Sequence, residues 1–213
     1  MNKTLSRTLF FLLCLALILL AACSNELSGI RGPEATVIFD YADNSSSPEV
    51  RLCVFTETSG NVRRLEKFCL KSLKENFVWE TKDFIQVQNG NKLYAGYTNF
   101  VVPQGFYIPK GEYEINYIEA DQKEYSIEVL VNYEEKLYES NAENFQSLCN
   151  NLTFNKKIAI YDINQALIYF GDIKNDLTTN EKILKKYKSA DSFRKVYCVQ
   201  DNSFYCLLPV EKI

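Results

Sequence analysis

Between residues 34 and 134 the chain consists of short β-type segments separated by turn signals, a pattern that few folds accommodate. Residues 112–120 and 126–133 alternate apolar with mostly polar side chains, which is typical of strands that bury one face. About seven strands over about 100 residues predict a mainly β fold, an Ig-like antiparallel β-sandwich over residues 34–134. The strands are expected at residues 35–41, 50–57, 62–72, 84–88, 92–103, 112–120 and 126–133.

Residues 135–213 show a different pattern, in which helix signals alternate with strands. Ser140 and Glu143 form a capping box, which predicts a helix over residues 141–152, and Thr178 and Glu181 form a second box. The order α-β-β-α-β-β predicts a small α+β unit, which either folds alone or packs against the sandwich. Its strands are expected at residues 157–162, 166–171, 191–200 and 203–209, the last two as a hairpin.

The N-terminus has the pattern of an export signal. Lys3 and Arg7 precede an uncharged run over residues 9–22, which is too short to span a bilayer comfortably and suits a signal-peptide core. The run ends in Leu20-Ala21-Ala22-Cys23, which resembles the lipobox of bacterial lipoproteins at all four positions. The resemblance implies that residues 1–22 are removed, that the Cys23 sulfur carries diacylglycerol, and that these lipid chains attach the protein to a membrane.

Residues 23–33 are mostly polar and contain two glycines and a proline, so we expect a tether between the lipid and the folded part. Ser24 follows the lipidated cysteine. In two-membrane bacteria an Asp at that position favours retention in the inner membrane. The lipobox resemblance therefore implies a cell-envelope location, with the outer membrane favoured over the inner one.

A second resemblance covers residues 108–133. The segment Ile108-Pro109-Lys110-Gly111-Glu112-Tyr113-Glu114-Ile115 resembles a late strand of Ig-like and transthyretin-like sandwiches in bacterial surface proteins. Repeats of that type often carry a Glu where this sequence has Tyr117. The resemblance implies the sandwich fold, without the intramolecular Lys–Asn isopeptide bond of those repeats.

Five cysteines follow the lipobox, and export permits disulfides. Cys53 and Cys69 lie symmetrically about a turn signal at residues 59–61, so a hairpin in that register brings the two side by side. This candidate disulfide requires that both strands belong to one sheet. In an Ig topology, consecutive strands can instead belong to different sheets, which would separate the two cysteines.

Cys198 and Cys206 lie symmetrically about Asn202 and are a second candidate pair. Cys149 is then unpaired, on the apolar face of the helix expected at residues 141–152. It is interpreted as a buried thiol, with an intermolecular bridge or a nucleophile as the alternatives.

Histidine is absent from all 213 residues, which excludes every catalytic triad, general base and metal site that depends on imidazole. The chain carries 24 basic and 27 acidic residues without a basic block, so nucleic acid is not an expected partner. The sequence contains no Cys-x-x-Cys pair and no Gly-rich phosphate loop. We therefore expect no metal site and no cofactor.

A Ser-x-x-Lys motif at Ser192 and Lys195 is similar to the nucleophile–base spacing of penicillin-binding enzymes. The Lys-Thr-Gly motif of those enzymes is absent from the sequence. Paired carboxylates for glycoside hydrolysis are also available, although no pair is singled out. A cell-envelope hydrolase that uses carboxylates, or Ser192 and Lys195, is therefore the alternative to a non-enzymatic protein.

Residues 94–107 combine five aromatic side chains with two glycines and a proline. Tyrosine is rigid and amphipathic and serves well in the recognition of proteins or sugars. Alternatively, these rings fill the core of the sandwich, and alternation places Tyr94 and Tyr97 on opposite faces of their strand. The candidate ligand-binding residues are Tyr94, Tyr97, Phe100, Phe106 and Tyr107.

These features predict a lipid-anchored bacterial envelope lipoprotein that acts as a non-enzymatic binding or assembly module. Its expected partners are the membrane, through the lipid, and an envelope protein, a host ligand or a glycan, through the β-sandwich. A third hypothesis is a structural lipoprotein of a larger complex, with residues 94–107 buried in the assembly.

Overall fold

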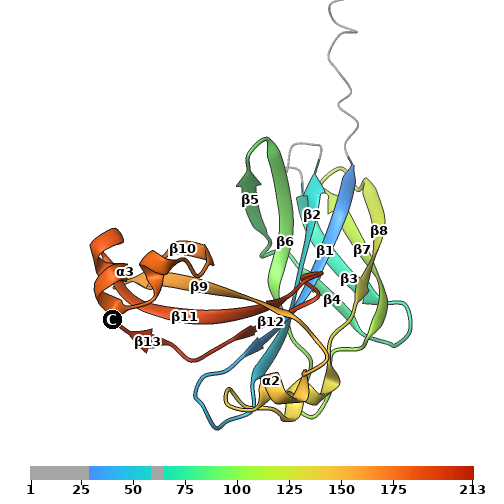
Figure 1. Ribbon diagram of the computed structural model, residues 1–213. Coiled ribbons are helices and arrows are strands. Elements are labelled where there is room, and N and C mark those ends of the chain that lie inside the picture. Colours follow the sequence, from blue (N-terminus) through green and yellow to red (C-terminus); the bar gives the residue numbers. More distant parts are fainter. Residues whose placement is uncertain (1–28, 59–64) are drawn as a thin grey trace, which may run out of the picture.

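The computed structural model describes residues 29–58 and 65–213, and the protein is mainly β (Figure 1). The predicted signal peptide (residues 1–22), Cys23 and the turn signal at residues 59–61 lie outside the described residues. The described residues of the first half of the chain form eight strands: β1 (Ile30–Asp40), β2 (Glu49–Thr58), β3 (Leu65–Ser72), β4 (Val78–Thr81), β5 (Ile85–Asn89), β6 (Lys92–Phe100), β7 (Gly111–Glu119) and β8 (Glu124–Val131).

The second half adds short helices and further strands. The helices are η2 (Glu135–Glu139), α2 (Phe145–Leu148), η3 (Asn175–Leu177) and α3 (Asn180–Lys186). The strands are β9 (Phe154–Asp162), β10 (Leu167–Asp172), β11 (Ala190–Val199), β12 (Phe204–Leu207) and β13 (Glu211–Lys212).

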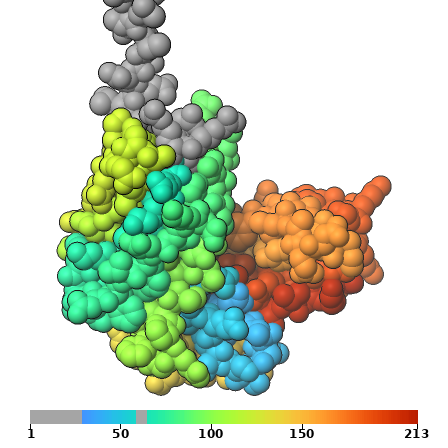
Figure 2. All heavy atoms as spheres, turned by 180° about the vertical axis from the view of Figure 1, so that it is seen from behind, coloured from blue at the N-terminus to red at the C-terminus, as the bar shows by residue number. Residues whose placement is uncertain are grey.

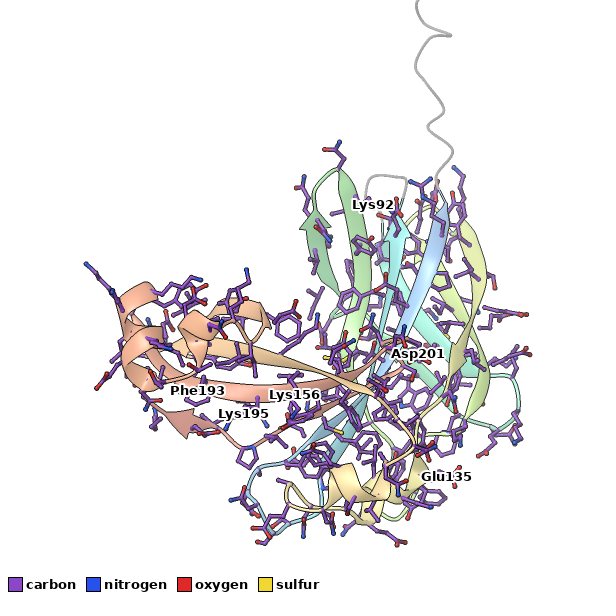
Figure 3. All side chains as sticks on the ribbon, viewed as in Figure 1. Lys92, Glu135, Lys156, Phe193, Lys195 and Asp201 are labelled. Carbon is purple, nitrogen blue, oxygen red and sulfur yellow. The ribbon has the colours of Figure 1, made fainter. Side chains whose placement is uncertain are left out.

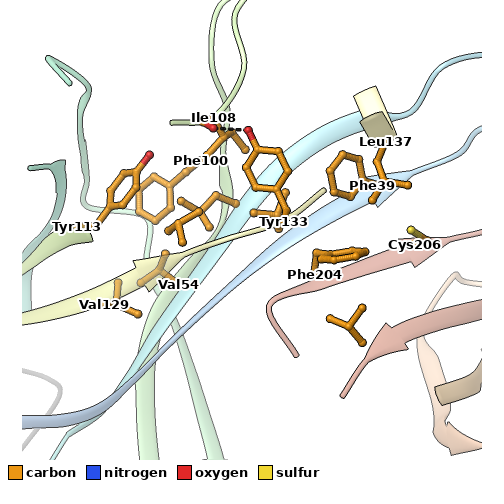
Figure 4. Packing of buried hydrophobic residues seen from close by; sticks show 14 of the residues in the cluster. Phe39, Val54, Phe100, Ile108, Tyr113, Val129, Tyr133, Leu137, Phe204 and Cys206 are labelled. Carbon is orange, nitrogen blue, oxygen red and sulfur yellow. Dashed lines mark hydrogen bonds between the residues drawn. The ribbon is translucent and has the colours of Figure 1, made fainter. Parts of the chain in front are cut away.

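Two sheets form the fold. The larger sheet has the order β10-β9-β11-β12-β1-β2-β6-β5, with β13 paired to β11, and the smaller sheet has the order β4-β3-β7-β8. Because alternate side chains of a strand point to one face, Val37 and Phe39 of β1 are buried in one core cluster with residues of the smaller sheet. Figure 4 shows Phe39 in this cluster together with Tyr113 of β7 and Val129 of β8. The prediction of a mainly β, sandwich-like fold is confirmed.

The C-terminal region continues the larger sheet. Strand β12 pairs with β1 in parallel, from Val37 opposite Phe204 to Asp40 opposite Leu207. Strands β9, β10 and β11 with α3 project sideways from the sandwich as an arm (Figures 1 and 2). The arm has a small core of its own, formed by Ile158, Ile160, Leu177, Ile183 and Phe193. The sheet therefore crosses the predicted boundary between residues 134 and 135.

Asp40 joins three strands at the base of the arm. Its carboxylate accepts a hydrogen bond from Arg51 Nη1 of β2 at 2.9 Å and another from Arg194 Nη2 of β11. Burial alone raises the pKa of Asp40, but the two guanidinium groups outweigh burial and hold this pKa below its ordinary value. Arg194 Nε also donates to the Leu208 carbonyl at 2.6 Å, so this cluster fixes the junction of arm and sandwich.

The predicted tether is shorter than expected. Strand β1 begins at Ile30, and its first residues Ile30 and Arg31 pair with Thr58 and Glu57 of β2. Arg31 forms an ion pair with Glu57 at 2.5 Å. Residues 30–33, which were assigned to the tether, therefore belong to the sandwich.

The helix predicted over residues 141–152 is wrong in length, because only Phe145–Leu148 is α-helical. Ser140 does not cap it. The Ser140 hydroxyl instead donates to the Leu137 carbonyl at 2.7 Å and lies 2.6 Å from the Tyr41 hydroxyl in the core. The second helix begins one residue later than its box predicts, with Thr179 Oγ1 as the cap that accepts from Lys182 N.

The disulfide predicted between Cys53 and Cys69 is wrong. Cys53 lies on β2 of the larger sheet and Cys69 on β3 of the smaller sheet, so the two strands do not form a hairpin. Both are free thiols, and Cys53 Sγ donates to the Thr98 carbonyl at 3.2 Å.

The disulfide predicted between Cys198 and Cys206 is also wrong, although β11 and β12 do form the expected hairpin. Cys198 pairs with Tyr205 rather than with Cys206, a shift of one residue. Asn202 N donates to the Val199 carbonyl, and Asn202 then adopts a left-handed φ of 58°, a loop geometry that sets this register. A shift of one residue moves the two sulfurs to opposite faces of the sheet.

Cys149 lies in the core, as the buried interpretation requires. Burial raises the pKa of the Cys149 thiol to about 11. The thiol is therefore protonated near neutral pH, which disfavours its use as a nucleophile.

Thiol counting tests these corrections. We expect five titratable thiols per mature chain after denaturation without reductant, because Cys53, Cys69, Cys149, Cys198 and Cys206 are all free. Reaction with an aromatic disulfide reagent measures the number. A count of one thiol per chain would instead show that the two disulfides predicted from the sequence are present.

Candidate functional site

The structure divides the five aromatic candidates among three environments. Phe100 is only 1% exposed, and its ring lies 5.0 Å from that of Tyr97. A register shift between β2 and β6 pairs Val54 with Tyr97 and Leu52 with Phe100, which turns both rings into the core. Phe100 is therefore a core residue, and its assignment to ligand binding is wrong, whereas the half-buried Tyr97 packs against the core and its assignment stays a prediction.

Tyr94 lies on the opposite face of β6. It lines a shallow hollow of about 250 Å³ together with Phe55, Val87, Glu34 and Asn89. Exposed or half-buried side chains form this hollow, and it is smaller than the cavity described next.

Phe106 and Tyr107 are 59% and 44% exposed, in the loop between β6 and β7. They line a pocket of about 420 Å³, which we call the distal pocket. The rings support one another, since Tyr107 stacks on Tyr138 with centroids 3.9 Å apart and Phe106 meets Phe77 edge-on at 6.2 Å. The remaining lining residues are Glu75, Phe77, Gly105, Ile108, Pro109, Lys110, Tyr133 and Glu135.

Three tyrosine hydroxyls hold the loop of the distal pocket in place. Tyr133 donates to the Ile108 carbonyl (Figure 4), and Tyr113 donates to the Pro109 carbonyl at 2.7 Å. Ile108 N in turn donates to the Tyr138 hydroxyl at 2.9 Å. Burial raises the pKa of both Tyr113 and Tyr133, so these hydroxyls keep the protons that they donate. The exposed rings are thus presented on a rigid loop.

Charged groups of both signs surround the distal pocket. Glu75 lies beside Phe77, and Glu135 begins η2. Lys110 Nζ lies 3.4 Å from Glu135 and 5.7 Å from the centroid of the Tyr133 ring. The pocket therefore offers apolar ring surface together with hydrogen-bond donors and acceptors.

The distal pocket lies at the end of the sandwich opposite the start of β1. Strand β6 runs parallel to β1 because both are antiparallel to β2, so the loop after Phe100 is at the same end as Asp40. Figure 3 shows Glu135 at this end and Lys92 at the other. The 11 residues of β1 span about 35 Å between the two ends.

Ser192 and Lys195 do not form the predicted nucleophile–base pair. Both lie on strand β11, where residues three apart face opposite sides of the sheet. Ser192 is buried, whereas Lys195 Nζ forms an ion pair with Glu211 at 2.7 Å. A helical turn, which the motif requires, is replaced here by extended backbone.

Within residues 29–58 and 65–213, no group of three or more metal-binding side chains occurs, and no helix is long and apolar enough to cross a membrane. No protein-family model matches the chain, and no curated protein matches it.

Proposed function

We propose that the protein is an exported, lipid-anchored lipoprotein of the bacterial cell envelope that binds an envelope glycan, without catalysis, at the distal pocket. The observation that carries this proposal is the pair of exposed rings, Phe106 and Tyr107, on a rigid loop beside Glu75, Lys110 and Glu135. Large aromatic rings that are grouped and exposed in a free protein often mark the surface that a binding partner covers in the complex.

The pocket chemistry suits a saccharide. A sugar ring has apolar C–H faces and polar hydroxyl groups, and binding sites of this kind combine aromatic walls with a few placed polar groups. Phe106 and Tyr107 supply the walls, while Glu135 and Lys110 supply an acceptor and a donor.

Binding accounts for the pocket better than hydrolysis does. A carboxylic acid that protonates a glycosidic oxygen is usually held in an apolar, desolvated position. Glu75 and Glu135 are both exposed, and Glu135 is paired with Lys110.

The location of the pocket agrees with a lipid anchor. Cys23, on which the lipid is predicted, precedes β1 in the sequence, and the pocket lies at the far end of the sandwich, about 35 Å from the start of β1. Such an arrangement presents the exposed rings away from the membrane that carries the lipid.

Calorimetric titration with soluble peptidoglycan fragments tests this function. We expect Phe106→Ala and Tyr107→Ala each to weaken binding about tenfold, since truncation of an aromatic anchor commonly costs more than 1 kcal/mol. Leu130→Ala is the matched control, because Leu130 is 64% exposed on β8 and lies outside the pocket.

Absence of binding by the wild type, or unchanged binding by the double variant, would refute glycan recognition here. Envelope-protein capture that depends on the same two rings would assign the pocket to a protein partner instead.

A further inference from the structure

The distal pocket already holds one ammonium group, which belongs to Lys110. Its Nζ lies 5.7 Å from the centroid of the Tyr133 ring and 3.4 Å from the Glu135 carboxylate. A cation within about 6 Å of a ring centroid is attracted by the negative face of the ring. The ring and the carboxylate therefore form a cation site, which the chain fills with its own Lys110.

A second set of the same groups lines the pocket without a cation of the chain beside it. This set consists of a carboxylate and three rings: Glu75, Phe77, Phe106 and Tyr107. Glu75 N donates to Ser72 Oγ at 3.2 Å, which fixes the backbone of Glu75 beside the pocket. Within residues 29–58 and 65–213, no ion pair reaches the Glu75 carboxylate and no Lys or Arg lies over these three rings.

Two of the three rings present open surface. Tyr138 stacks on one face of Tyr107 with the centroids 3.9 Å apart, yet Tyr107 is 44% exposed, so its opposite face is open. Phe106 is 59% exposed and meets Phe77 edge-on. An ammonium group in the pocket would therefore meet ring surface as well as the Glu75 carboxylate.

The charges that line the distal pocket also favour a cation. Its lining contains the carboxylates of Glu75 and Glu135 and the ammonium group of Lys110. Lys110 is paired with Glu135, so the charge of Glu75 is not balanced within the lining. A phosphate or carboxylate of a ligand would be repelled by this charge, whereas an ammonium group would be attracted.

We propose that the distal pocket selects a saccharide that carries a primary ammonium group, which is held by Glu75 and the three rings beside it. This inference rests on the proposed glycan binding at the same pocket and adds the charge of the ligand. Aromatic rings combined with a carboxylate are a common means of recognising ammonium ligands. An envelope glycan can carry the ammonium group on an amino sugar that has lost its acetyl group, or on a diamino acid of an attached peptide.

Calorimetric titration of the full mature chain in detergent, with two matched pairs of ligands, tests the proposal and separates the two sources. The first pair is the trimer of glucosamine and the trimer of N-acetylglucosamine. The second pair is a disaccharide–tripeptide with a free lysine amine and the same fragment acetylated at that amine. We expect the free amine to bind about fivefold more tightly than its acetylated partner, as an exposed cation–π contact with one ion pair should provide. The pair that shows this preference identifies the source.

Two variants are expected to change this preference in opposite directions. Glu75→Gln removes the unbalanced charge and should lower the preference below about twofold, whereas Lys110→Gln frees Glu135 and Tyr133 for the ligand and should raise it to about tenfold. A merely structural disturbance of the pocket would not produce opposite changes. Glu112→Gln is the matched control, because Glu112 is an exposed carboxylate on β7 outside the pocket lining, and it should leave the preference unchanged.

The outcomes distinguish this inference from the function on which it rests. Equal binding within both pairs, or tighter binding of the acetylated members, would overturn ammonium selection while glycan binding stands. A preference that Glu75→Gln leaves intact would overturn the role of Glu75 and with it the proposal. If none of the four ligands binds the wild type, the proposed glycan binding and this inference are both refuted.

Discussion

Replacement of Cys23 by Ala is expected to abolish incorporation of labelled palmitate and to leave a precursor that retains residues 1–22. The lipobox places the acylated sulfur and the cleavage site at the same residue, so both modifications depend on it. Each buried CH₂ contributes about 0.8 kcal/mol, and two or three acyl chains therefore give stable attachment, whereas one chain is marginal. Labelling of growing cells followed by gel electrophoresis measures label and length together.

The matched control is Cys14→Ala, because Cys14 lies within the uncharged run and should be removed with it. This variant is expected to keep both the label and the mature length. Label that persists in Cys23→Ala would show that the lipid is attached elsewhere, and absence of label from the wild type would show that the signal is an ordinary secretory one.

Replacement of Phe39 by Ala is expected to lower the free energy of unfolding by about 3–5 kcal/mol. Phe39 of β1 is fully buried, and its ring lies 5.8 Å from Tyr133, 5.6 Å from Tyr138 and 6.0 Å from Phe204. Rigid rings on three sides cannot collapse into the space that the benzyl group leaves. Urea denaturation, with the midpoint compared at constant slope, measures the change.

Leu130→Ala is the control for this experiment and is expected to change stability by at most about 0.5 kcal/mol, because Leu130 is exposed. Phe204 belongs to β12, so we also expect the sandwich and the C-terminal region to unfold in one transition. A loss below about 1 kcal/mol for Phe39→Ala would contradict the packing described for this ring.

Local patterns were good guides to individual strands. The alternation at residues 112–120 and 126–133 predicts two strands with opposite buried and exposed faces, and β7 and β8 follow it. The turn at Asn202 predicts the β11–β12 hairpin correctly but not its register. A register depends on the geometry of the loop, and a difference of one residue reverses which side chains face each other.

Helix signals were weaker guides. A capping box lowers the free energy of a helix start by about 1 kcal/mol, which the surrounding structure easily outweighs. Ser140 shows this, because its hydroxyl hydrogen-bonds within the core with Tyr41 and Leu137 rather than capping α2.

Only part of the candidate site could be predicted from the sequence. The aromatic stretch at residues 94–107 identified Phe106 and Tyr107, but its alternation was broken by the register shift that turns Tyr97 and Phe100 inward. Glu75 and Glu135 reach the distal pocket from distant parts of the chain and carry no local signal.

The sequence by itself determined the properties that depend on neighbouring residues: the expectation of a lipid on Cys23, the absence of imidazole chemistry, and the mainly β character. Only the tertiary structure decided which strands share a sheet, that Cys53 and Cys69 are on different sheets, and that β12 joins β1 across the predicted boundary. The physical reason is that alternation specifies a buried face but no partner. The partner is chosen by the free energy of the whole packed core, in which residues such as Phe39 and Phe204 meet from opposite ends of the chain.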